Sequence, residues 1–257
     1  MPVVALGIPG VTDPALEAAA GSLRWFKLGQ IDAPIKALKD AGVRKVVMAG
    51  KVQHVSLFGG VLPDWRAAKL LLGLKDKRTD TILRAVVGEF EKDGLEFVSS
   101  ATFLEHLLAP AGALTRRALS KTQLEDAALG WRAAKAVAGF DIGQTVVAQG
   151  GAIVAVEGME GTDACVKRAA ELARSQGREP ALVVVKVAKP RQDFRFDLPV
   201  VGLDTLANFR ACGVEALALE AGATLIFDRD RFAADADAAS ISVAGFPPEG
   251  PNHDRNV

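Results

Sequence analysis

Residues 144–156 read QTVVAQGGAIVAV, and this stretch decides what kind of fold the second half of the chain adopts. Two short apolar runs flank the pair Gly150-Gly151, and a glycine-containing turn between two such runs is typical of a β-hairpin. A helical pattern at 162–175 and a buried strand at 182–187 follow the hairpin. This succession predicts a mixed α+β domain.

Further elements complete this predicted second domain, which we place at residues 123–257. We expect helices at 123–138, 205–212 and 229–238 and short strands near Ala216, Thr224 and Ile241. Prolines and glycines from about residue 247 onward predict a loose tail. The stretch 110–122 mixes Pro, Gly, Ser and basic residues, so residues 113–122 are predicted to be a linker.

The first half alternates short strands with helices. Strands are expected at 3–6, 45–49 and 95–99. One helix is expected to begin at Asp13-Pro14, and a second to run through Ile31, Ile35 and Leu38 to a C-cap at Gly42. Two more helices are expected at 64–72 and 80–92. Short strands that alternate with helices of about 10–15 residues predict a parallel sheet with right-handed crossovers. Residues 1–112 are therefore expected to form an open, Rossmann-like parallel-sheet domain, and the whole chain an α/β protein.

The composition excludes several classes of protein. Of 257 residues, 49% are hydrophobic and 24% charged, which supports a sizeable core and argues against disorder. The 31 basic and 31 acidic residues cancel, and tyrosine is absent, so neither duplex nor single-stranded nucleic acid is an expected partner. The two cysteines, Cys165 and Cys212, are expected to be buried reduced thiols. Without a signal-peptide pattern or a long apolar run, the sequence predicts a soluble protein.

Two segments of the second half concentrate groups that can carry chemistry. The first, EGMEGTD at 157–163, lies between a predicted strand and a predicted helix. Its glycines allow close backbone approach, a helix start favours phosphate, and its three carboxylates suit Mg²⁺ beside phosphate oxygens. A helix start capped by Thr162 or Asp163 explains the same residues equally well.

The second segment, KVAKPRQDFRFDLP at 186–199, follows a buried strand. Its lysines and arginines can hold a diphosphate, and Asp193 and Asp197 can hold a metal or position a water molecule. A helix would place both acids on one side, whereas an extended chain would place them on one face together with Arg195. The alternative is a solvated loop with internal salt bridges.

The first half offers weaker candidates. Lys51 follows a predicted strand end, where open α/β sheets bind ligands. Asp80 and Arg84 have helical i, i+4 spacing, although an exposed ion pair explains them slightly better. The three histidines, His54, His106 and His253, are isolated in the sequence and are not expected to bind metal. His106 is expected on a helix surface.

At these residues the sequence resembles the LpxI-type UDP-2,3-diacylglucosamine pyrophosphatases. The matching segments are GMEGTD at 158–163 with Arg168, KPRQDFRFDLP at 189–199 with Gly202, LGQ at 28–30, VMAGKV at 47–52, Asp80-x-x-Leu83-Arg84, LAPAG at 108–112, EAG at 220–222 and Ala234-Asp235. They occur in the same order along nearly the whole chain.

This resemblance implies a lipid A pathway enzyme of Gram-negative bacteria. Such enzymes hydrolyse UDP-2,3-diacylglucosamine to 2,3-diacylglucosamine 1-phosphate (lipid X) and UMP with a divalent metal, usually Mg²⁺, and water attacks the phosphorus nearer the sugar. The family implies a Rossmann-like N-terminal domain and an α+β C-terminal domain. It also implies a homodimer that is cytoplasmic and peripheral at the inner membrane.

Residue type and the resemblance together assign roles within these motifs. Asp197 and Asp193 are expected to bind Mg²⁺ or orient the attacking water, and Glu160 and Asp163 to complete the metal-binding cluster. Substrate binding is expected at Lys189, Gln192, Arg191, Arg195, Thr162, Gly161, Lys51, Asp80 and Arg84. Family members usually begin with an extra strand and a glycine-rich turn, whereas this sequence starts at the strand that follows. The first family strand is thus expected to be missing here, either because the start is misassigned or trimmed or because this branch lacks the strand.

Two other classes of function fit parts of the same sequence. A non-catalytic protein that binds nucleotide sugars or acylated sugar phosphates would keep the basic residues but need no acidic cluster. A structural homodimer without a ligand would not need the dense segment 189–199. The apolar helix residues 67–72 could line an acyl groove, although their helical spacing favours a place in the core.

Overall fold

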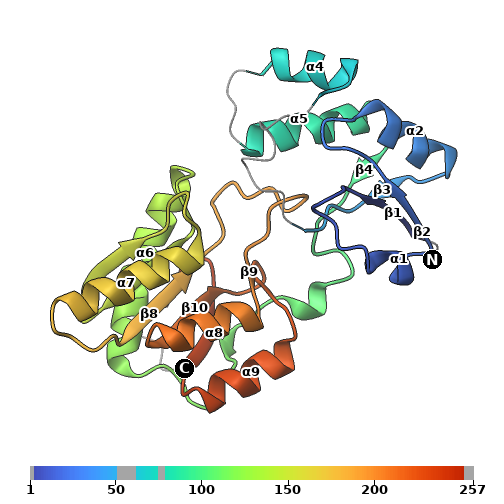
Figure 1. Cartoon of the computed structure of the whole chain (residues 1–257). Helices are drawn as coiled ribbons and strands as arrows, with labels where there is room; N and C mark the ends of the chain where they lie inside the picture. The colour runs from blue at the N-terminus through green and yellow to red at the C-terminus, as the bar shows by residue number, and fades with distance from the viewer. Residues whose placement is uncertain (1–2, 51–61, 75–78, 252–257) are drawn as a thin grey trace. The chain divides into compact units, whose positions relative to one another are not determined.

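The computed structural model describes residues 3–50, 62–74 and 79–251 (Figure 1). The chain divides into two compact units, Met1–Thr102 and Phe103–Val257. The predicted two-domain α/β class is confirmed: parallel strands and helices make up the first unit, and helices cover a mixed sheet in the second.

The first unit is built from pairs of short parallel strands. Strand β1 (Val4–Gly7) pairs with β2 (Ser22–Trp25), and β3 (Lys45–Val46) pairs with β4 (Glu96–Phe97). Strands β3 and β4 are shorter than the predicted strands at 45–49 and 95–99, and strand β2 was not predicted. Within the described residues these pairs form separate two-stranded sheets instead of one open sheet.

Helix ends in this unit follow local backbone chemistry. Helix α2 (Asp32–Asp40) ends as predicted at Gly42, whose φ of +70° allows Val43 N–H to donate to Leu38 C=O. The prediction at Asp13-Pro14 was wrong, because Asp13 accepts from Ala15 N–H in a turn and helix α1 (Leu16–Ala19) begins only after it.

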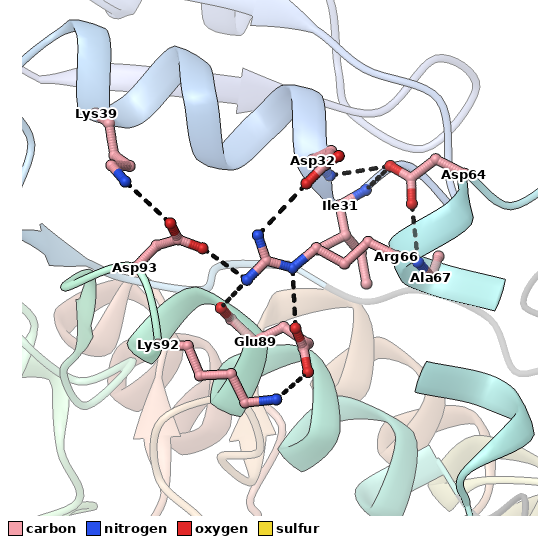
Figure 2. Close-up of polar contacts among 9 residues, drawn as sticks. All are labelled: Ile31, Asp32, Lys39, Asp64, Arg66, Ala67, Glu89, Lys92 and Asp93. Atoms are coloured by element: carbon pink, nitrogen blue, oxygen red, sulfur yellow. Dashed lines mark hydrogen bonds and ion pairs between the residues drawn. The ribbon is translucent and has the colours of Figure 1, made fainter. Parts of the chain in front are cut away.

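Two side chains connect the remaining helices, α4 (Trp65–Leu72) and α5 (Thr79–Glu91), to α2 (Figure 2). Asp64 accepts from Ala67 N–H at the start of α4 and from Ile31 N–H and Asp32 N–H at the start of α2. Arg66 contacts three acids, which lie on or beside α2 and α5: Asp32 at 3.4 Å, Glu89 at 2.9 Å and Asp93 at 2.6 Å.

The second unit contains a six-stranded sheet in the order β5-β12-β10-β8-β6-β7. Its strands are β5 (Gly112–Ala113), β6 (Thr145–Gln149), β7 (Ala152–Val156), β8 (Leu182–Lys186), β10 (Val214–Glu220) and β12 (Ser242–Phe246). Strands β8, β10 and β12 are parallel, whereas β6, which pairs with β8, and β5 run antiparallel to them.

The predicted hairpin is confirmed as β6–β7, which are antiparallel and joined by Gly150 and Gly151. Both glycines have positive φ, +60° and +78°, as a type I′ turn requires. The carboxylate of Asp126 accepts from both turn N–H groups, at 2.8 and 2.6 Å. The hairpin is therefore fastened to the helix that carries Asp126.

Helices cover both faces of this sheet (Figure 1). Helix α6 (Lys121–Gly139) packs on one face, where Trp131 lies in a core cluster with Val185. Helices α7 (Thr162–Ser175), α8 (Leu203–Ala211) and α9 (Arg229–Ala238) share a second core cluster, which includes Val184. A pair of very short strands, β9 (Val200–Val201) and β11 (Leu225–Ile226), completes the unit.

The segments predicted as linker and tail are packed on this unit. Ala109 N–H donates to Thr224 C=O, β5 pairs with β12, and the hydroxyl of Thr115 accepts from Val243 N–H at 2.8 Å. These bonds are the physical reason that residues 113–122 are not a loose connection. Beyond residue 247, the indole N–H of Trp131 donates to Pro248 C=O, which holds the start of the expected tail.

Candidate active site

Charged side chains gather at one edge of the six-stranded sheet. Lys186 and Glu220 end the parallel strands β8 and β10, and Glu157 follows β7 at the same edge. All three are less than a tenth exposed. The carboxyl ends of parallel strands are where α/β sheets bind ligands, and buried charges are tolerated only when they are paired or hydrogen-bonded.

The hydroxyl of Thr162 connects two of these charges. Lys186 Nζ donates to Thr162 Oγ1 at 2.8 Å, and that hydroxyl donates to Glu157 Oε1 at 2.9 Å. Thr145 Oγ1 lies 3.2 Å from the same hydroxyl, and Glu157 Oε2 accepts from Gln144 N–H at 3.1 Å. We call Thr145, Glu157, Thr162 and Lys186 the Thr162 network.

Two glycines give this network its backbone geometry. A Cβ at Gly143 would lie 2.1 Å from Glu157 C=O, so only glycine allows the α6–β6 turn to pass this close to Glu157. Gly161 occupies the N-cap position of α7 with a φ of +83°, and the helix begins at Thr162. The alternative in which Thr162 or Asp163 caps the helix does not hold, because Gly161 is the N-cap residue and the Thr162 hydroxyl contacts Glu157 and Lys186.

The acidic residues beside the start of α7 face other partners. Glu160 pairs with Arg168 at 2.6 Å, and this contact holds the pKa of Glu160 below its ordinary value. Asp163 accepts from the side-chain amide of Asn208 at 3.2 Å. Both acids are exposed.

The segment 186–199 forms a loop held by its own side chains. Gln192 accepts from Lys189 N–H at 2.6 Å and donates to Asp197 C=O at 2.9 Å. Asp197 N–H donates to Asp193 C=O, so the chain makes a single turn here and is neither an extended strand nor a continuing helix. Arg195 forms two hydrogen bonds to the Asp193 carboxylate, at 2.9 and 2.8 Å.

Two acids to which the sequence assigned no role, Glu220 of the EAG segment and Asp141, anchor this loop to the sheet and to α6. Glu220 accepts from Ala188 N–H at 2.7 Å and pairs with Lys135 of α6 at 2.6 Å. Asp141, in the turn after α6, lies 2.6 Å from Lys189 Nζ, and Asp197 lies 3.4 Å from the same atom. No local sequence signal marks either contact, since each joins residues far apart along the chain.

The structure does not bring together the four carboxylates predicted to bind Mg²⁺. Each has a nearby partner of its own: Asp193 contacts Arg195, Asp197 contacts Lys189, Glu160 contacts Arg168 and Asp163 contacts Asn208. Within residues 3–50, 62–74 and 79–251, no three His, Cys, Asp or Glu side chains are placed to hold one metal ion. The predicted cluster thus does not fit Mg²⁺ in this arrangement of the described residues.

The remaining predicted residues belong to other parts of the chain. Asp80 and Arg84 lie in α5 of the first unit, where Arg84 is exposed. Lys51, His54 and His253 lie outside the described residues. His106 is exposed in a short 3-10 helix, Glu105–Leu107, as expected. Cys165 and Cys212 are buried free thiols, as the composition indicated.

Comparison with known sequences gives matches in both halves of the chain. The model of the LpxI N-terminal domain matches residues 1–107, and the model of the LpxI C-terminal domain matches residues 110–244. The chain belongs to the LpxI family. A curated LpxI protein, the UDP-2,3-diacylglucosamine pyrophosphatase LpxI of Caulobacter vibrioides, is 32% identical over 243 residues, which cover 92% of this chain and 86% of that protein. The Thr162 network and the 186–199 loop lie within the match to the LpxI C-terminal domain.

Proposed function

We propose that this LpxI-family protein hydrolyses UDP-2,3-diacylglucosamine to 2,3-diacylglucosamine 1-phosphate and UMP in lipid A biosynthesis. The observation that carries the proposal is the 186–199 loop at the carboxyl edge of the sheet, in a chain 32% identical to a protein named for this activity. The loop carries cations that can bind a diphosphate and a carboxylate that can orient a water molecule and accept its proton.

Charge stabilisation is the main demand of phosphoryl transfer. In the proposed reaction a water oxygen bonds to the phosphorus nearer the sugar, the bond from that phosphorus to the bridging oxygen breaks, and UMP leaves. Lys189, Arg191 and Arg195 lie in the loop from which they would neutralise the diphosphate. The start of α7, at Gly161 and Thr162, offers backbone N–H groups to a phosphate.

The two acids of the loop are suited to different tasks. Both oxygens of Asp193 accept hydrogen bonds from Arg195, so Asp193 holds that guanidinium in place. Asp197 has a longer contact, 3.4 Å, with Lys189. From its residue type and the family resemblance we assign to Asp197 the orientation of the attacking water and the acceptance of its proton, and from its contacts we assign to Asp193 the placement of Arg195.

The test is release of UMP by the purified full chain from UDP-2,3-diacylglucosamine. We expect turnover in the parent and a loss of at least about a hundredfold in Asp197→Asn, which keeps the shape of the side chain. Parallel reactions with Mg²⁺ and with EDTA test the Mg²⁺ requirement separately. Substrate binding without UMP release would contradict the proposal and support the non-catalytic binding protein.

The same proposal includes contact with a membrane surface and formation of a homodimer. In the first unit Leu62, Trp65 and Leu72 are 92%, 84% and 89% exposed, and Lys69 shares a helix face with Trp65 and Leu72. Trp, Leu and Lys on one face suit the lipid–water interface. Across the described ranges, no helix is both long and apolar enough to span a bilayer.

Vesicle flotation tests this contact. We expect the parent to float with vesicles that contain anionic lipid and Trp65→Ser/Leu72→Ser to float less. Equal flotation of the two proteins would contradict the assignment of this face. Light scattering of the parent tests the homodimer, and a monomeric mass would exclude it.

A further inference from the structure

The turn between α6 and β6 holds an acidic residue in a backbone conformation that favours glycine. Asp141 has a φ of +60°, and its N–H donates to Ala138 C=O while Ile142 N–H donates to Val137 C=O. These two bonds define the helix C-terminal motif in which the left-handed residue is usually glycine. Helix α2 ends with the same pair of bonds and has Gly42 at this position.

Asp141 is unfavourable here for a second reason. A carboxylate just after the last turn of a helix lies near the negative end of the helix dipole, where cations are preferred. The residue thus breaks two local rules of helix termination. Residues held in a disfavoured conformation against local preference often serve a functional site.

The contact that Asp141 makes joins it to the loop assigned to catalysis. Its Oδ1 lies 2.6 Å from Lys189 Nζ, closer than Asp197 Oδ2 at 3.4 Å. The Lys189 side chain is only 18% exposed, so its ammonium group is held between two carboxylates. One of these carboxylates is on the loop itself, and the other is on the turn that follows α6.

We propose that Asp141 is a positioning residue that holds Lys189 and thereby limits how closely Lys189 pairs with the Asp197 carboxylate. The inference rests on the proposed hydrolysis for its catalytic consequence. Without Asp141, Lys189 loses its closer carboxylate and pairs more closely with Asp197. A carboxylate in a closer ion pair is a weaker acceptor for the proton of the attacking water. Loss of Asp141 therefore lowers kcat more than it changes KM.

Two variants separate this role from a structural one. Asp141→Gly removes the carboxylate and relieves the backbone, so we expect it to fold at least as stably as the parent. Asp141→Asn keeps a side chain that tolerates the left-handed conformation but removes the charge. We expect kcat to fall about tenfold in both variants, with KM changed less than about twofold.

The chain supplies a matched control at the end of α9. Ser240 has a φ of +59° and the same two helix-ending bonds, from Ser240 N–H to Asp237 C=O and from Ile241 N–H to Ala236 C=O. Ser240→Gly relieves the same kind of backbone strain in a different part of the unit. We expect its kcat to equal that of the parent.

A readout independent of activity tests the contact itself. We expect an amine-reactive reagent, with sites mapped by mass spectrometry, to label Lys189 about threefold faster in Asp141→Asn than in the parent, as loss of a partly exposed ion pair implies. Unchanged labelling, or kcat within twofold of the parent in both Asp141 variants, overturns the proposal. If the parent releases no UMP, the proposed function fails and the labelling alone decides whether Asp141 holds Lys189.

Discussion

Thr162→Val is the substitution whose effect follows most directly from the structure. Valine has nearly the shape of threonine but lacks the hydroxyl, which accepts from Lys186 Nζ at 2.8 Å and donates to Glu157 Oε1 at 2.9 Å. Both charged groups are less than a tenth exposed, so water does not readily replace the lost partner. The substitution therefore leaves two buried polar groups each without one hydrogen bond.

The size of the effect can be estimated from these two groups. Leaving a buried donor or acceptor unsatisfied costs about 1–3 kcal/mol, and Glu157 keeps its bond from Gln144 N–H, which moderates the loss. We expect the free energy of unfolding of the second unit to fall by about 2–4 kcal/mol. For a unit of this size that lowers Tm by roughly 5–15 °C. Thr162→Ser keeps the hydroxyl and loses one partly buried methyl group, which costs less than about 1 kcal/mol.

The assay must report on the second unit alone, because two units need not unfold together. The three tryptophans are Trp25, Trp65 and Trp131, and only Trp131 lies in the second unit. In a Trp25→Phe/Trp65→Phe background, the fluorescence of the buried Trp131 follows its unfolding in urea. If the free energies of unfolding of Thr162→Val and Thr162→Ser agree within about 0.5 kcal/mol, the hydroxyl does not stabilise the Thr162 network.

Three further predictions concern other charges and thiols. Lys135→Met leaves the Glu220 carboxylate, 5% exposed, without its cation at 2.6 Å, so the free energy of unfolding read from Trp131 should fall by about 3 kcal/mol; an unchanged urea midpoint would refute this. Burial raises the pKa of the Cys165 thiol to about 12 and also raises that of the buried Cys212, so iodoacetamide should label neither thiol in native protein at neutral pH; rapid native labelling would contradict the buried placement. Lys92 and Arg66 lower the pKa of Glu89 from 4.5, and Lys39 and Arg66 lower that of Asp93 from 3.8. Their stabilisation is present above these values and lost as the pH falls through the lower folded-state pKa values. The protection of amides in α2 and α5, taken relative to the intrinsic exchange rate at each pH, should therefore fall in acid more in the parent than in Arg66→Met; an equal fall would show that the Arg66 contacts contribute nothing.

Local patterns in the sequence predicted the local elements. The glycine pair of the β6–β7 hairpin and the bounds of α9, residues 229–238, are both found where expected, because turn chemistry and helical periodicity act over a few residues. Strand β2 escaped prediction because SLRW is short and not uniformly apolar. The strand order could not be read, since pairing of β5 with β12 depends on contacts between segments far apart in the sequence.

In the candidate site, too, the sequence predicted the local segments but not the contacts between segments that are far apart along the chain. The motifs located the loop at 186–199 and the start of α7, because charge density and glycines are visible in the sequence. They did not reveal the pairing partners, so nothing in the sequence indicated that the four carboxylates lie apart in this structure: Glu160 faces Arg168, and Asp193 faces Arg195. Asp141 had no recognisable pattern because its role arises only when the turn after α6 meets Lys189.

Hydrolysis of UDP-2,3-diacylglucosamine in ¹⁸O-labelled water, with both products analysed by mass spectrometry, shows at once whether the bond is cleaved and which phosphorus the water attacks. We expect the parent to release UMP, one ¹⁸O atom to appear in 2,3-diacylglucosamine 1-phosphate, and Asp197→Asn to form neither product at a comparable rate. Intact substrate, label in UMP, or an Asp197→Asn protein as active as the parent would contradict the proposed reaction.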